Sequence, residues 1–197
     1  MSKAREQHAE WLRLIEVNGP FLAEPILEVA FPQGLPGLDG EKKLHFRLEY
    51  NLFRDEIDDP SLSIQYKTKA HFDWIHWVLT QGLEWHTGGI GEDLKISDAI
   101  PENIRLERAE YDLVLRPDYA MYGGSKELPY LIVNTYPEGT NLEEAQKGES
   151  WSTSPAERMS QLCRATGVRL GLVTDGERWM LVDAPEDGLT SYASWYA

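Results

Sequence analysis

Three side chains near the centre of the sequence have the types and spacing of a hydrolytic site: Asp118, Asn134 and Tyr136. Metal-dependent nucleases need hard oxygen ligands for magnesium and a group that orients or activates water. Asp118 supplies a carboxylate and Asn134 an amide oxygen. Tyr136 has a phenol whose unperturbed pKa is about 10, so it supplies no cation at neutral pH. This set predicts weak metal binding together with weak water activation.

Two extended stretches position these side chains. Residues 111–121 and 130–136 are rich in β-branched and aromatic residues and are bounded by Gly and Pro, which predicts a β-hairpin. Alternation along a strand places Asn134 and Tyr136 on one face of the second stretch. Asp118 follows Pro117 in the first stretch. Its structural interpretation is a carboxylate at the end of a strand that pairs with Arg116.

The hairpin resembles the core of the PD-(D/E)XK nucleases, the fold of many restriction enzymes. In that family an Asp after Pro ends one strand and Glu-X-Lys lies on the next. Here Asp118 fits, while Asn134 stands at the Glu position and Tyr136 at the Lys position. The resemblance implies a restriction-endonuclease-like α/β (α+β) fold with a mixed central sheet flanked by helices. It also implies a degenerate site with Asp118, Asn134, Tyr136 and Glu49 at the catalytic positions and Asp118 as the metal ligand.

An active site remains an alternative, because catalytic groups migrate among PD-(D/E)XK nucleases. Glu138, Glu143 or Lys147 could supply the missing groups from just beyond the second stretch, and Glu49 could do so from its helix. In that case the chain would be a Mg-dependent endonuclease with weakly bound Mg.

Cys163 falls on an apolar helical face, which predicts a buried structural thiol rather than a nucleophile.

A wider resemblance covers most of the chain. The runs WLRLIEVNGPFL (11–22), FPQGL (31–35), YPEGT (136–140) and the segment 154–179 are similar to the start of large bacterial proteins that carry an adenine-type DNA methyltransferase. Those proteins belong to restriction-modification and phage-defence loci. Neither Asn-Pro-Pro-Tyr nor a glycine-rich cofactor loop is present, so the chain is expected to be the N-terminal region of such a protein. S-adenosylmethionine is then expected only in the parent protein, and DNA would be bound through the parent, with defence-system subunits as further partners.

Net charge opposes direct DNA binding. The chain has 19 Lys and Arg against 33 Asp and Glu, a formal net charge of -14. Because phosphate contacts need clustered cations, the isolated chain is expected to bind DNA poorly. An acidic protein-interaction or DNA-mimic module is therefore a second alternative function.

The remaining composition fits a cytoplasmic protein without a membrane span. No apolar run approaches the ~18 residues that cross a bilayer, and one cysteine forms no internal disulfide. We expect a single nuclease-like domain over 1–197, with a helical part over about 1–87 and a sheet-bearing core over about 100–197.

Periodicity and capping signals predict the elements. Leu44, Leu48 and Leu52 recur every four residues on one stripe of a helix that Asp39 caps. Ser154 and Pro155 begin another helix, and Asp175-Gly176 turns a hairpin. A short strand or loop is expected over 63–68. Further helices are expected over 3–18, 24–30 and 71–83, and strands over 104–108, 111–121, 130–136, 168–174 and 177–182.

Overall fold

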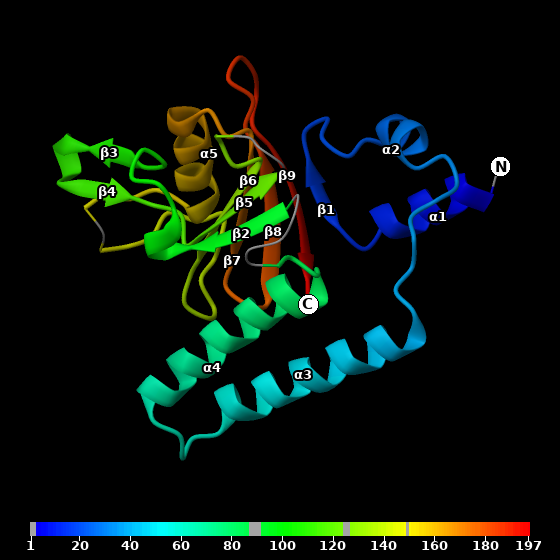
Figure 1. The fold of residues 1–197 in the computed structure, drawn as a ribbon, viewed down its shortest axis with the longest axis horizontal. Helices are drawn as coiled ribbons and strands as arrows, with labels where there is room; N and C mark the ends of the chain where they lie inside the picture. Colours follow the sequence, from blue (N-terminus) through cyan, green and yellow to red (C-terminus); the bar gives the residue numbers. More distant parts are fainter. Residues whose placement is uncertain (1–2, 87–91, 124–126, 149) are drawn as a thin grey trace.

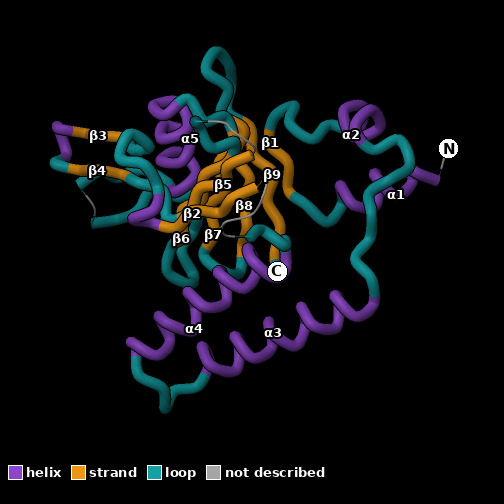
Figure 2. The backbone as a smooth tube through the Cα atoms, in the orientation of Figure 1, coloured by secondary structure: helices purple, strands orange, loops and turns teal. Residues whose placement is uncertain are grey.

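The computed structural model describes residues 3–86, 92–123, 127–148 and 150–197. Its centre is a seven-stranded sheet in the order β1-β9-β8-β7-β6-β5-β2, antiparallel except for the parallel pair β6–β7 (Figures 1 and 2). Strands β3 and β4 form a separate two-stranded sheet. The strands are β1 (Glu16–Asn18), β2 (Glu92–Ile96), β3 (Leu106–Arg108), β4 (Leu113–Leu115), β5 (Tyr119–Gly123), β6 (Leu131–Thr135), β7 (Leu170–Thr174), β8 (Arg178–Asp183) and β9 (Ser191–Tyr196).

Helices cover both faces of this sheet (Figure 1). The helices are α1 (Lys3–Leu12), α2 (Glu24–Ala30), α3 (Gly40–Asp58), α4 (Ile64–Trp77), which continues as a π-helical turn over Val78–Gly82, and α5 (Pro155–Thr166). Of these, α1 and α2 lie beside the edge strand β1, while α5 covers one face and α3 and α4 the other (Figure 1). The expected mixed sheet flanked by helices is thus confirmed as an α+β arrangement. Within the described ranges no helix has both the length and the apolar character of a membrane span.

Helix α5 covers one face of the sheet. Ser154 Oγ accepts a hydrogen bond from the Glu157 N–H and Pro155 occupies the first helical position, as the sequence predicts. Met159 and Leu162 lie in one core cluster with the inward side chains of the sheet. Gly171 on β7 permits this close packing, because a Cβ there would lie 2.3 Å from Met159 Cγ.

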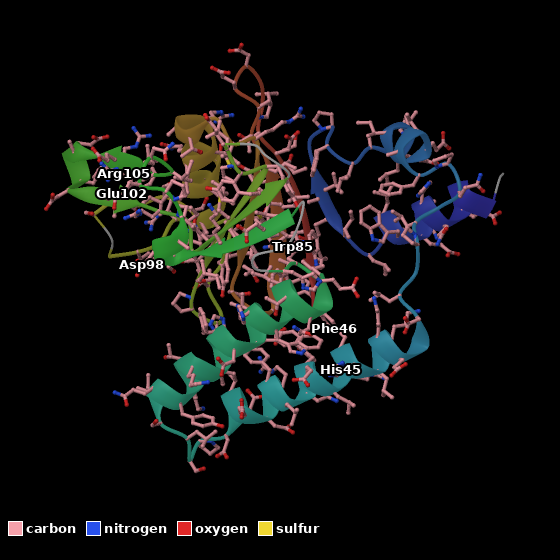
Figure 3. All side chains as sticks on the ribbon, in the orientation of Figure 1. His45, Phe46, Trp85, Asp98, Glu102 and Arg105 are labelled. Atoms are coloured by element: carbon pink, nitrogen blue, oxygen red, sulfur yellow. The ribbon has the colours of Figure 1, made fainter. Side chains whose placement is uncertain are left out.

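Helices α3 and α4 form the layer on the opposite face, with α4 between α3 and the sheet (Figure 1). Phe46 of α3 points towards α4 (Figure 3), and its ring makes edge contacts with Trp74 and Trp77. Asp39 Oδ1 caps α3 by accepting from the Lys42 N–H, which confirms the predicted cap. The side of α3 that faces the protein carries Phe46, Tyr50, Phe53 and Ile57. The predicted leucine stripe therefore lies on the other, solvent-facing side.

The expected hairpin is only partly correct. Residues 111–121 do not form one strand, because β4 ends at Leu115 and pairs with β3, whereas β5 begins at Tyr119 in the central sheet. Pro117 lies at the break, and a proline has no N–H to donate to a strand ladder. The second stretch, β6, matches its prediction and pairs antiparallel with β5.

Two further expectations in the N-terminal part are wrong. The helix expected over 3–18 ends at Leu12, and Glu16–Asn18 is strand β1, which pairs with β9 near the other end of the chain. The segment 63–68 is the first part of α4, capped by Ser63 Oγ, rather than a strand or loop. The helix expected over 24–30 is confirmed, as are the two strands around Asp175-Gly176.

Candidate functional site

Asp118 lies directly before β5, and its hydrogen bonds reach the neighbouring strand β6. Its N–H donates to the carbonyl oxygen of Val133 at 2.8 Å. Its Oδ2 accepts two hydrogen bonds from Thr135, one from the backbone N–H at 2.7 Å and one from Oγ1 at 2.9 Å. Asp118 is therefore hydrogen-bonded to Val133 and Thr135, the residues on either side of Asn134. One of its two carboxylate oxygens already accepts hydrogen bonds.

Asn134 is next to Asp118 and is 6% exposed. Its Nδ2 donates to the carbonyl oxygen of Arg116 at 2.8 Å, so the amide fastens β6 to the segment that leads into β5. Its Oδ1 is buried and has no hydrogen-bond partner among the described residues. Asn134 thus lies between Val133 and Thr135, the two residues that hydrogen-bond to Asp118, and both Asp118 and Asn134 help to hold the strands together.

Tyr136 follows the end of β6. Its N–H donates to the carbonyl oxygen of Thr174 at 2.8 Å, and its partly buried ring packs against the core cluster under α5. A phenol in this position contributes packing and a hydroxyl. It supplies no ammonium of the kind that a Glu-X-Lys site uses.

The proposed substitutes have other partners. Glu138 lies 2.7 Å from Arg54, and Glu143 lies 2.8 Å from Arg178. Glu49 pairs with His45 on its own helix at 3.4 Å, and no contact joins it to Asp118 in the described part of the chain. Lys147 is exposed in the loop after β6.

Arg116 does not form an ion pair with Asp118, contrary to the structural interpretation from sequence. Its guanidinium lies 3.4 Å from Glu102 Oε1. Glu102 also binds Arg105, and both side chains lie in the region of β3 and β4 (Figure 3). The partner of Asp118 is Thr135, the residue between the two predicted site positions.

The donors around Asp118 fit a divalent cation poorly. Mg²⁺ prefers several oxygen ligands in near-octahedral geometry. Asp118 is the carboxylate of this site and its Oδ2 accepts two hydrogen bonds, so among the described residues here Asp118 Oδ1 and Asn134 Oδ1 are the oxygens left for a cation. In the described ranges no group of three His, Cys, Asp or Glu side chains has metal-binding geometry.

A cleft of about 500 Å³ adjoins this site and was not anticipated from sequence. Thr135, Tyr136 and Glu138 form one wall, and the α4 side chains, including His71 and Phe72, form the other. His71 Nε2 donates to the carbonyl oxygen of Asp175 at 2.7 Å, which fixes α4 against the β7–β8 turn. The helical period of residues 64–75 would have revealed this wall. It was missed because residues 63–68 were expected to form a strand or loop.

Burial perturbs two groups that could otherwise be reactive. Burial raises the pKa of the Cys163 thiol to about 12, so the thiolate is not formed at neutral pH. This residue is the buried structural thiol that the sequence predicts. Burial, and secondarily the charges of Asp118 and Asp73, raise the pKa of Tyr119, which also remains neutral.

Comparisons of the chain with protein-family models, with curated proteins and with solved structures find no match.

Proposed function

We propose that this chain is a restriction-endonuclease-like module with a degenerate active site. In this proposal it positions DNA or partner subunits for an attached adenine-type DNA methyltransferase of a restriction-modification or phage-defence system. The order of elements supports the proposal: an antiparallel pair β5–β6, then α5, then β7 parallel to β6. Asp118 lies directly before β5, and Asn134 lies on β6 beside it.

The observation that carries the proposed loss of catalysis is the double hydrogen bond from Thr135 to Asp118 Oδ2. A carboxylate oxygen used in this way is a structural acceptor, and a metal would compete with both Thr135 donors for Oδ2. Losing one electrostatic element of an active site commonly costs ~10²–10³ in rate, and here the Glu and the Lys positions are both replaced.

The charges of the described residues favour a partner protein over direct DNA binding. Many surface cations already lie within 4 Å of a carboxylate, so they are poorly placed to replace counterions on DNA. These cations are Lys42, Lys69, Arg54, Arg105, Arg108, Arg116, Arg169 and Arg178. An interaction module is accordingly the second candidate function, and an active endonuclease is less well supported.

The test compares cleavage of supercoiled plasmid with Mg²⁺ or Mn²⁺ by four proteins. They are the wild type, Asp118→Ala, the double variant Asn134→Glu, Tyr136→Lys, and the matched control Asp187→Ala, which changes an exposed loop carboxylate. We expect no cutting by the wild type or by either alanine variant. Cutting by the double variant alone would support a nuclease scaffold whose catalytic groups have been lost.

Wild-type cutting that Asp118→Ala abolishes and Asp187→Ala leaves intact would contradict the proposal. It would place the active site at Asp118 with a migrated partner. Thermal unfolding followed by circular dichroism checks that each variant is folded. DNA binding is measured separately, as the affinity of the isolated chain for a labelled duplex at two salt concentrations. We expect this affinity to be weak. The measurement reports DNA positioning independently of cleavage.

A further inference from the structure

The outer face of α3 carries an uncovered apolar ridge, formed by Leu44, Leu48 and Leu52. These leucines are 58%, 52% and 57% exposed. Residues four apart lie on the same face of a helix, so the three side chains form one continuous row. The opposite face of α3 is the one that packs on the protein, through Phe53 and Ile57. The helix therefore has two apolar faces, and the protein covers only one of them.

The position of α3 in the fold leaves this leucine ridge accessible. In Figure 1, α3 is the outermost element on its side of the molecule, and α4 separates it from the sheet. A helix that is apolar on two sides is normally packed on two sides. Apolar rows that remain exposed on a folded protein mark interaction sites.

One carboxylate lies at each end of the leucine ridge. Glu41 lies three residues before Leu44 and Asp55 three residues after Leu52, so both lie on the ridge face, about 21 Å apart along the helix. Both are exposed, and neither has an ion-pair partner among the described residues. Many other acidic groups of the protein are paired, Glu84 with Lys42 and Asp58 with Arg54 among them.

We propose that the leucine ridge of α3 docks an amphipathic helix of a basic partner protein. That helix would present its own apolar row between two Lys or Arg side chains. Because the ridge has a carboxylate at each end, the cations meet Glu41 and Asp55 whether the helices run parallel or antiparallel. A second copy of this chain is a poorer occupant, because its ridge ends in the same two carboxylates and its formal net charge is also -14. This inference rests on the proposed positioning role, but its test uses no nuclease assay, so the two can fail separately.

The test uses two synthetic helical peptides and the full chain. Both peptides carry Leu at three positions spaced by four, with Lys three residues before the first Leu and three after the last. In the control peptide, Glu replaces these two Lys. We expect the lysine peptide to bind about tenfold more tightly at low salt, with the difference shrinking as salt is raised.

Three variants sharpen the result. Glu41→Lys with Asp55→Lys should reverse the preference between the peptides. Leu48→Ser should weaken binding of both, whereas Leu189→Ser, which changes a leucine that is 86% exposed in a distant loop, should leave binding unchanged. Absent binding, equal binding of the two peptides, or a preference that the charge reversal does not invert would overturn the proposal. A dimer detected by light scattering that Leu48→Ser dissociates would overturn it too, because the occupant would be a second copy.

Discussion

The two helical layers of this protein cover their faces of the sheet in different ways. On one face α5 stands alone, and its one apolar side is buried completely against the strands, with Leu162 at 0% exposure. On the other face the layer is two helices deep, and the outer helix α3 leaves Leu48 half exposed. An amphipathic pattern thus identifies a helix reliably, while the covered side depends on what the rest of the chain places against it.

The largest expected effect contrasts a leucine from each layer. Leu162→Ala should lower the free energy of unfolding by about 2–5 kcal/mol, because it opens a cavity in the core under α5. Leu48→Ala should change it by about 0.5 kcal/mol or less, since the side chain is half solvated in the isolated chain. Urea denaturation of both variants is the measurement. An equal loss in the two variants would mean that the ridge is covered in solution, and the contrast between the layers would then be lost.

A smaller effect on the free energy of unfolding is expected at Asp118 and Thr135, which lie at the ends of β5 and β6 in the central sheet. Asp118→Ala removes the acceptor of two Thr135 hydrogen bonds and should cost about 1–3 kcal/mol of unfolding free energy. Thr135→Val keeps the backbone donor and removes only Oγ1, so about 0.5–1.5 kcal/mol is expected. The ratio of the two losses, measured by chemical denaturation, tests whether Asp118 has become a structural acceptor. No loss in either variant would remove that interpretation.

The smallest effect concerns two tyrosines, one on each face of the sheet. Tyr119 lies under α4 and Tyr122 on the α5 side, and neither hydroxyl has a hydrogen-bond partner among the described residues. Replacing either with Phe should change the free energy of unfolding at pH 7 by about 1 kcal/mol or less, because no hydrogen bond is lost.

The pH dependence of these variants has a defined sign. Burial raises the pKa of both tyrosines in the folded protein, with nearby Asp side chains as the second cause. Their contribution is therefore complete below the unfolded-state pKa of about 10 and falls as the pH rises from there towards the folded-state values. Denaturation between pH 8 and pH 11 should show a shallower alkaline loss for Tyr119→Phe than for the wild type. An unchanged slope would mean that Tyr119 titrates normally.

Several elements with local signals were predicted correctly, although the cap and helical period at the start of α4 were missed. Asp39 and Ser154 cap their helices through hydrogen bonds within one turn, and the Asp175-Gly176 turn depends on its own residues. Prediction failed where a distant strand supplied the decisive partner. Glu16–Asn18 becomes a strand because β9 offers its edge, and no feature of the first 20 residues encodes that.

The candidate site divides in the same way. The hairpin prediction was enough to place Asn134 on the strand that pairs with β5, the strand that Asp118 precedes. Only the tertiary structure decided that Thr135 satisfies Asp118, that Arg116 pairs with Glu102 instead, and that α3 turns its leucines outward. The physical reason is common to all three: hydrogen bonds, ion pairs and burial depend on which groups meet in space, whereas a sequence pattern fixes only each residue's position along its own element.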